Sequence, residues 1–288
     1  MSVPRRAAVV GSPIAHSLSP VLHRAAYTAL GLVGWDYERI ECDDRGLPAL
    51  VRGLEPEWVG LSVTMPGKRA ALELADETTE RARLVGAANT LVRRSEGGWR
   101  ADCTDVDGVV GALRCAGGYQ ARSGASAVVL GAGGTALAAL AALVELEVDE
   151  AVLVVREPAR ATEALACAER VGLKVRAERW TSDLDLAGLA ADSDVVISTV
   201  PAGAADAVAE QLAHARCVLD VVYHPWPTPL ARAVTGRGGR IATGLDMLLH
   251  QAFGQVEQFT GRPAPRQVMR EALRAATGGA LPLPVTAG

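Results

Sequence analysis

Short apolar runs alternate with amphipathic segments along the chain. Beyond residue 125, β-branched runs each precede a segment of helical periodicity, and they lie at residues 128–130, 151–155, 194–198 and 217–220. The helices predicted after these runs are residues 134–146, 158–171, 204–213 and 227–235. Strands that alternate with helical segments are typical of a parallel sheet with helical crossovers.

The first 104 residues show the same alternation and are predicted to form a separate α/β unit. Its expected strands are residues 7–10, 37–40, 59–63, 89–93 and 99–101, and its expected helices are residues 20–30, 44–53, 67–75 and 77–84. Near the end of the chain, residues 244–259 and 265–276 have helical apolar spacing. The fold class is therefore α/β, with two α/β domains.

Composition narrows the class of ligand. With 288 residues, 49% of them apolar, the chain can fill two cores. A net charge of -4 gives no basic surface for nucleic acid or an acidic membrane, so a small molecule is the expected ligand. Five cysteines without a C-x-x-C pair argue against a disulfide framework or a zinc site, so we expect no metal and a cytoplasmic location.

Two segments bear on membrane association. No signal peptide is visible at the N-terminus. Residues 123–144 carry no charge, but they contain G-A-G-G and then mostly alanine. A strand, a glycine turn and a helix fit this segment better than a membrane span.

The stretch V-V-L-G-A-G-G-T-A is a candidate dinucleotide site. Glycines at 131, 133 and 134 let the backbone approach a pyrophosphate at a helix N-terminus. Arg156 follows the next strand, where an NAD enzyme usually carries an acid for the ribose 2′-hydroxyl, and Arg160 adds a second cation. An arginine there favours NADP, although Glu157 would favour NAD if it pointed toward the ribose.

Residues 11–20, G-S-P-I-A-H-S-L-S-P, precede a predicted helix. Ser19 is a good N-cap and Pro20 suits the first helical position. Ser17 is left unexplained by capping, and two hydroxyls beside a helix N-terminus can also hold a carboxylate.

Two further stretches carry candidate chemistry. Lys68 ends S-V-T-M-P-G-K and Asp105 ends D-C-T-D; an ammonium beside a carboxylate can have its proton affinity tuned for transfer. Taken alone, Lys68 is an ordinary lysine at a helix start, and Thr104 or Asp105 is a helix cap. Asn89 in G-A-A-N-T is either a turn residue or a polar group for substrate hydroxyls.

Seven motifs together resemble the shikimate dehydrogenase family, most of all its actinobacterial branch. In order they are S-P-I-A-H-S-L-S-P, S-V-T-M-P-G-K, V-G-A-A-N-T-L, D-C-T-D, L-G-A-G-G, D-V-V-Y-H-P-W-P-T-P-L and G-L-D-M-L-L-H-Q-A-F. The resemblance implies reversible reduction of 3-dehydroshikimate to shikimate with NADPH, on the pathway to chorismate and the aromatic amino acids. It also implies a Rossmann-type domain at residues 105–244, inserted into a substrate-binding and catalytic domain of residues 1–104 completed by residues 245–288.

The resemblance also assigns site residues. The catalytic pair is Lys68 with Asp105. The substrate-binding positions are Ser17, Ser19, Thr64, Lys68, Asn89, Asp105, Tyr223 and Gln251, with the serine pair on the substrate carboxylate. The cofactor-binding positions are Gly131, Ala132, Gly133, Gly134, Thr135, Arg156, Arg160, Thr199, Val200, Gly244 and Met247.

Three positions depart from the family pattern. Cys103 and Ser62 stand where asparagine is usual, and Glu157 stands where a small hydroxyl residue commonly meets the 2′-phosphate. The first two bear on substrate geometry and the third on cofactor choice. The rival hypotheses are an NAD-dependent quinate/shikimate dehydrogenase of catabolism and a non-catalytic shikimate or dinucleotide sensor. The expected assembly is a monomer or homodimer.

Overall fold

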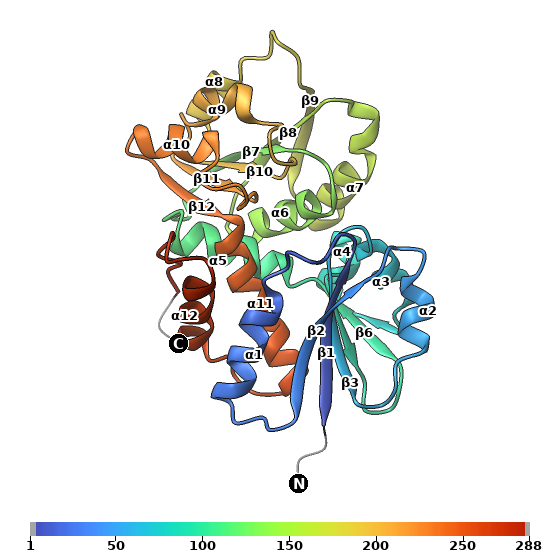
Figure 1. Ribbon diagram of the computed structural model, residues 1–288. Helices are drawn as coiled ribbons and strands as arrows, with labels where there is room; N and C mark the ends of the chain where they lie inside the picture. Colours follow the sequence, from blue (N-terminus) through green and yellow to red (C-terminus); the bar gives the residue numbers. More distant parts are fainter. Residues whose placement is uncertain (1–3, 286–288) are drawn as a thin grey trace. The chain divides into compact units, whose positions relative to one another are not determined.

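The computed structural model describes residues 4–285, which form two compact units. The first comprises Met1–Thr104 and Leu248–Gly288, and the second comprises Asp105–Met247. Figure 1 shows an α/β arrangement in both, so the predicted fold class is confirmed.

The first unit is built on a six-stranded mixed sheet in the order β2-β1-β3-β5-β6-β4. Its strands are β1 (Arg5–Gly11), β2 (Trp35–Glu41), β3 (Trp58–Val63), β4 (Glu77–Thr78), β5 (Thr90–Arg93) and β6 (Trp99–Asp102). Its helices are α1 (Ser19–Ala29), α2 (Leu47–Arg52), α3 (Lys68–Leu74), α4 (Glu80–Val85), most of α11 (Gly244–Thr260) and α12 (Arg266–Ala276).

Both faces of this sheet are covered by helices. On one face, Tyr27 of α1 and Phe259 of α11 pack with Val9 and Tyr37 of the sheet. On the other, Leu47 of α2 and Ala71 of α3 pack over Leu61 and Leu91. Gly60 lets α11 approach closely, since a Cβ there would collide with the Phe259 ring.

The second unit contains a six-stranded parallel sheet in the order β12-β11-β10-β7-β8-β9. Its strands are β7 (Ser126–Leu130), β8 (Glu150–Val155), β9 (Lys174–Arg179), β10 (Val195–Ser198), β11 (Cys217–Asp220) and β12 (Arg240–Thr243). Its helices are α5 (Asp105–Cys115), α6 (Gly134–Glu145), α7 (Thr162–Val171), α8 (Leu186–Asp192), α9 (Ala209–Leu212) and α10 (Pro229–Gly236), with short 3-10 helices η1 (Pro158–Ala161) and η2 (Asp206–Val208).

This strand order is that of a dinucleotide-binding fold. Read from β9, the sheet runs third, second, first, fourth, fifth and sixth strand of the unit, which is the Rossmann order. The order reverses between β7 and β10, and ligands bind in the crevice outside the carboxyl ends of the strands at such a point.

Several predicted elements differ from the structure. The helix predicted for residues 77–84 is wrong at its start, because Glu77 pairs with Arg100 in the short strand β4 and Thr79 caps α4 by accepting from Ala82 N. The helix predicted for 158–171 begins with a 3-10 turn, and the one predicted for 204–213 is divided into η2 and α9. Strands β9 and β12 and helix α8 were not predicted.

Candidate active site in two units

The serine pair lies on the loop between β1 and α1. Ser17 Oγ donates to Ser19 Oγ and accepts from the Ser19 backbone N–H, both at 3.3 Å. The Arg39 guanidinium donates to the Ser17 carbonyl from Nε and Nη2, at 2.9 and 2.6 Å. The two hydroxyls therefore contact each other beside the start of α1, and Arg39 holds the backbone of their loop.

The N-cap expectation for Ser19 is wrong. Helix α1 begins at Ser19 itself, Leu18 occupies the N-cap position, and within the described chain this cap makes no side-chain hydrogen bond. Pro20 lies one residue further into the helix than expected. Because Ser19 does not cap α1, helix capping does not explain its hydroxyl, and ligand binding remains as the predicted role.

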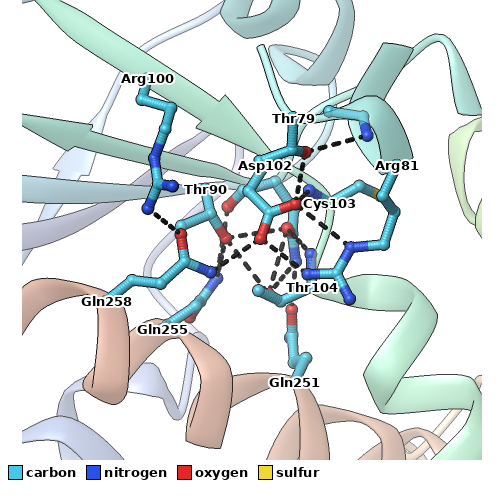
Figure 2. A network of polar contacts seen from close by, with 12 residues as sticks. Thr79, Arg81, Thr90, Arg100, Asp102, Cys103, Thr104, Gln251, Gln255 and Gln258 are labelled. Atoms are coloured by element: carbon cyan, nitrogen blue, oxygen red, sulfur yellow. Dashed lines mark hydrogen bonds and ion pairs between the residues drawn. The ribbon is translucent and has the colours of Figure 1, made fainter. Parts of the chain in front are cut away.

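Asn89 is the centre of a buried polar network in the first unit, and Figure 2 labels its partners Thr90, Thr104 and Gln251. Its Oδ1 accepts from the Thr104 backbone N–H at 2.7 Å and from the Thr90 hydroxyl at 2.9 Å. Its Nδ2 donates to Gln251 Oε1 at 2.6 Å and to Thr104 Oγ1 at 3.0 Å. The structure thus brings together Asn89 and Gln251, two predicted substrate-binding residues from the two separate segments of the first unit.

Three glutamines of α11 line up on the network, as Figure 2 shows for Gln251, Gln255 and Gln258. Spacings of four and three residues place them on one helix face. Gln255, which is 2% exposed, donates to the Asn89 carbonyl at 3.3 Å and to the Thr90 hydroxyl at 3.2 Å. Of the three, only Gln251 is among the residues predicted from the sequence, although the glutamine spacing is a visible signal.

Ser62, at a position where the family usually has asparagine, belongs to the same network. Its hydroxyl donates to Gln255 Oε1 at 2.8 Å and accepts from Tyr37 at 2.7 Å. His23 Nε2 lies 3.4 Å from the same Gln255 oxygen, and the His23 ring stacks on Tyr37 with centroids 3.9 Å apart. The small side chain of Ser62 therefore joins a sheet residue, Tyr37, to α11.

Asp102 anchors a charged arm of the network. Arg81 binds its carboxylate through Nη2 at 2.6 Å and Nε at 3.2 Å, while Thr79 and Gln258 donate to it at 2.7 Å each. Burial alone would raise the pKa of this carboxyl, but the hydrogen bonds and charge of Arg81, aided by Thr79 and the Cys103 N–H, lower it overall. Asp102 thus remains ionised and holds the strand that leads to Thr104.

The proposed catalytic residues each begin a helix. Lys68 is the half-buried first residue of α3, and its carbonyl accepts from the Ala88 N–H at 2.9 Å, one residue before Asn89. Thr64 directly follows β3, and its N–H donates to the Val10 carbonyl at 2.9 Å. In the second unit, Asp105 is the buried first residue of α5 and directly follows Thr104.

The glycine turn of the second unit follows β7. Gly131 has φ +97°, and a Cβ there would lie 2.7 Å from Thr199 Oγ1. Gly133 is the N-cap of α6, and its Cβ position is open, with no atom of the described residues within 4 Å. Thr199, just after β10, donates to the Leu130 carbonyl through its N–H at 3.0 Å and its hydroxyl at 2.7 Å. The turn therefore lies at the β7/β10 reversal of the sheet, beside Thr199.

Other predicted residues of this unit lie near the carboxyl ends of strands. A cavity of about 380 Å³ opens beyond β10 and β11, lined in part by Val200, Val222 and Trp226. A Cβ at Gly244 would collide with the Val221 carbonyl and lie 2.8 Å from Tyr223 Cδ1. Gly244 therefore has to be small for the Tyr223 loop to pack against the start of α11.

Asp246 organises the start of α11 beside the predicted residue Met247, which is buried. Its Oδ2 accepts from the Thr243 N–H at 2.9 Å and the Thr243 hydroxyl at 2.7 Å. Its Oδ1 has no hydrogen-bond partner among residues 4–285, and burial raises its pKa. Neither Asp246 nor Thr243 is among the residues predicted from the sequence.

Two features, a membrane-spanning helix and a metal-binding group, are absent from the described residues. No helix within residues 4–285 is long and apolar enough to cross a membrane. The same residues contain no group of three His, Cys, Asp or Glu side chains placed to hold a metal ion.

The second unit contains a parallel sheet in Rossmann order with a glycine turn at its strand reversal, and the first contains a buried polar site on Asn89. Together these features define a two-domain dehydrogenase. Family models match in both parts of the chain: the shikimate dehydrogenase substrate binding domain at residues 9–91 and the shikimate 5'-dehydrogenase C-terminal domain at residues 244–274. The chain belongs to the shikimate dehydrogenase family.

Individual relatives cover almost the whole chain. A shikimate dehydrogenase (NADP(+)) of Roseobacter denitrificans is 37% identical over 95% of this chain and 97% of its own length. The crystal structure of Mycobacterium tuberculosis shikimate dehydrogenase has 55% identity and a TM-score of 0.88, covering 94% of this chain and 100% of that one. The Thermus thermophilus shikimate 5-dehydrogenase in complex with NADP(H) and shikimate has 32% identity and a TM-score of 0.79, covering 94% and 99%.

Proposed function

We propose that the protein catalyses the reversible, NADPH-dependent reduction of 3-dehydroshikimate to shikimate, a step in chorismate and aromatic amino acid biosynthesis. The observation that carries this function is similarity along almost the whole chain to proteins named NADP(+) shikimate dehydrogenases. A structure of this fold that holds shikimate and NADP(H), the Thermus thermophilus protein, supports both ligands.

The second unit fits a dinucleotide. The open Cβ position of Gly133 leaves room for a pyrophosphate at the N-terminus of α6, where backbone N–H groups favour an anion. We assign the pyrophosphate to Gly131, Ala132, Gly133, Gly134 and Thr135, the 2′-phosphate to Arg156 and Arg160, and the nicotinamide end to Thr199, Val200, Gly244 and Met247. The bound NADPH supplies the hydride.

Substrate binding is assigned mainly to neutral hydrogen-bonding groups. The hydroxyls of Ser17 and Ser19 bind the substrate carboxylate, supported by their placement beside the N-terminus of α1 and by the Arg39 contact to the loop. The remaining contacts are assigned to Thr64, Lys68, Asn89, Asp105, Tyr223 and Gln251. A ligand hydroxyl that replaces Gln251 Oε1 as the acceptor of an Asn89 Nδ2 hydrogen meets an amide whose orientation Thr104 and Thr90 already fix, which lowers the entropy lost on binding.

Proton transfer is assigned to Lys68 with support from Asp105. In the reducing direction the Lys68 ammonium donates a proton to the ketone oxygen as the carbonyl carbon gains hydride. In the oxidising direction the neutral amine accepts the proton from the alcohol. The Asp105 carboxylate stabilises the ammonium form and orients it.

We assign the enzyme to the cytoplasm, acting on a small molecule as a monomer or homodimer, without nucleic acid or membrane. The net charge of -4 and the absence of paired cysteine motifs in the sequence support this assignment.

One assay tests the function. Oxidation of shikimate and of quinate is followed by the absorbance of the reduced nicotinamide, each with NADP and with NAD. We expect the largest kcat/KM for shikimate with NADP. A larger value for quinate with NAD would replace the proposal with the catabolic enzyme, and ligand binding without turnover in any of the four mixtures would replace it with a sensor.

A further inference from the structure

Glu157 forms an ion pair that its sequence position does not suggest. Its Oε2 lies 3.9 Å from Nη2 of Arg179, the last residue of β9. Arg160, three residues further along, contacts Glu157 through its backbone N–H and not through its side chain in the described structure. A second strand therefore supplies the charge that faces Glu157.

The sheet register brings Arg179 to this place. Arg179 pairs with Val155 across the parallel strands, and the next N–H, that of Trp180, donates to the Val155 carbonyl at 2.8 Å. Val154 in turn pairs with Leu130, the residue before the glycine turn. Arg179 thus ends its strand at the same edge of the sheet as Arg156 and Gly131.

The charges at this edge conflict unless Glu157 is neutralised. Arg156 and Arg160 are exposed, and within residues 4–285 neither guanidinium forms an ion pair with a carboxylate. Both are thus available to a phosphate, whereas the Glu157 carboxylate beside them would repel one.

We infer that Arg179 is a specificity-determining residue for NADP, because its ion pair with Glu157 draws that carboxylate away from the 2′-phosphate site and cancels its charge. The inference rests on the proposed use of NADP and extends it to a residue outside the glycine turn and the Arg156 segment. The side chains of Arg179 and Glu157 are 63% and 54% exposed, so the pair acts through water and its effect declines with salt.

The test measures binding and needs no turnover. Adenosine 2′,5′-bisphosphate and AMP are titrated into the full chain by calorimetry at low ionic strength, and the ratio of their Kd values isolates the 2′-phosphate. We expect Arg179→Gln to weaken the bisphosphate roughly threefold to fivefold, because the unpaired Glu157 carboxylate then repels the 2′-phosphate through water, while AMP binding stays unchanged.

Two matched variants make the result specific. Arg176→Gln removes the same charge from β9 roughly 10 Å further back along the strand, and it should leave the ratio within about twofold of wild type. In a Glu157→Gln background, Arg179→Gln should change the Kd ratio of the bisphosphate and AMP much less, because no carboxylate remains to be neutralised.

The outcomes separate this inference from the proposed function. An unchanged ratio in Arg179→Gln, an equal loss in Arg176→Gln, or an undiminished loss in the Glu157→Gln background would overturn the role of Arg179 and leave NADP use intact. A wild-type protein that binds AMP as well as the bisphosphate would instead contradict the NADP preference itself.

Discussion

The Asn89 side-chain amide donates to Gln251 Oε1 at 2.6 Å, across 162 positions of the chain. The opposite end of the same amide accepts from Thr104 and Thr90, so the donor and acceptor sides of Asn89 are both fixed. A ligand that contacts Asn89 therefore meets a side chain already held in place by β5, the strand end before α5, and α11.

Lys68→Ala should reduce turnover to less than about a tenth of wild type while shikimate affinity changes by less than about tenfold. The ammonium acts mainly on the proton and charge that develop at the substrate oxygen, so its loss affects kcat most. Steady-state kinetics and calorimetric shikimate binding measure the two effects. The control is Lys174→Ala, an exposed residue of β9, and a Lys68→Ala enzyme of near wild-type rate would remove Lys68 from the catalytic role.

Ser17→Ala and Ser19→Ala should each raise KM for shikimate by roughly tenfold with a smaller effect on kcat. A hydroxyl that binds a carboxylate remote from the reacting carbon supplies binding equally to ground and transition states. Kinetics with varied shikimate provide the measurement, with exposed Ser95→Ala as the control. Wild-type KM values in both variants would exclude the serine pair from the substrate site.

Gln255→Met should destabilise the protein by about 1–3 kcal/mol. It removes the acceptor of the Ser62 hydroxyl and a donor to Thr90 at a site without access to water, so buried polar groups lose their partners. Denaturant unfolding measures the loss. The same substitution at exposed Gln267 should cost less than about 0.5 kcal/mol, and equal effects at the two sites would contradict a structural role for the network.

His23 should make stability depend on pH below neutrality. Complete burial lowers the pKa of His23 to about 3, against a smaller opposing effect of its hydrogen bond to Gln255. The unfolded chain binds a proton near about pH 6.5 and the folded chain does not, so stability falls as the pH drops from there toward 3. Between about pH 7 and 5, His23 should contribute a loss of up to about 2 kcal/mol.

His23→Phe tests this dependence, because it retains an aromatic ring on Tyr37 and cannot take up a proton. The free energy of unfolding is measured at both pH values in wild type and variant. His250, whose pKa burial lowers to about 4, is present in both proteins, so the difference between them isolates His23. Parallel pH profiles would show that His23 accepts a proton in the folded state.

Two glycine substitutions should separate folding from cofactor binding. Gly131→Ala places a Cβ against Thr199 at a φ of +97°, so it should lower both Tm and NADP affinity. Gly133→Ala has open space and φ −82°, so it should lower only NADP affinity by obstructing the pyrophosphate. Thermal unfolding and NADP titration measure these effects. Unaltered NADP binding in Gly133→Ala would place the dinucleotide elsewhere.

Local patterns determined the elements that bury an apolar face. The strand, glycine turn and helix from β7 to α6 were predicted because continuous β-branched residues, three glycines and an alanine-rich segment each favour one conformation locally. Strand β9, K-V-R-A-E-R, was missed because it is mostly polar and partly exposed, and only its pairing with β8 makes it a strand.

The sequence by itself also pointed to Lys68, Asn89 and Asp105, since each stands in a short motif that resembles one family. Which side chains hold these residues was decided only by the tertiary structure. Ser62 and Gln255 are 193 positions apart, and no local propensity encodes their contact. The same holds for Glu157 and Arg179, which meet because β8 and β9 pair in one register. A hydrogen bond or ion pair depends on distance in space, and that distance is set when helices and strands far apart in sequence pack together.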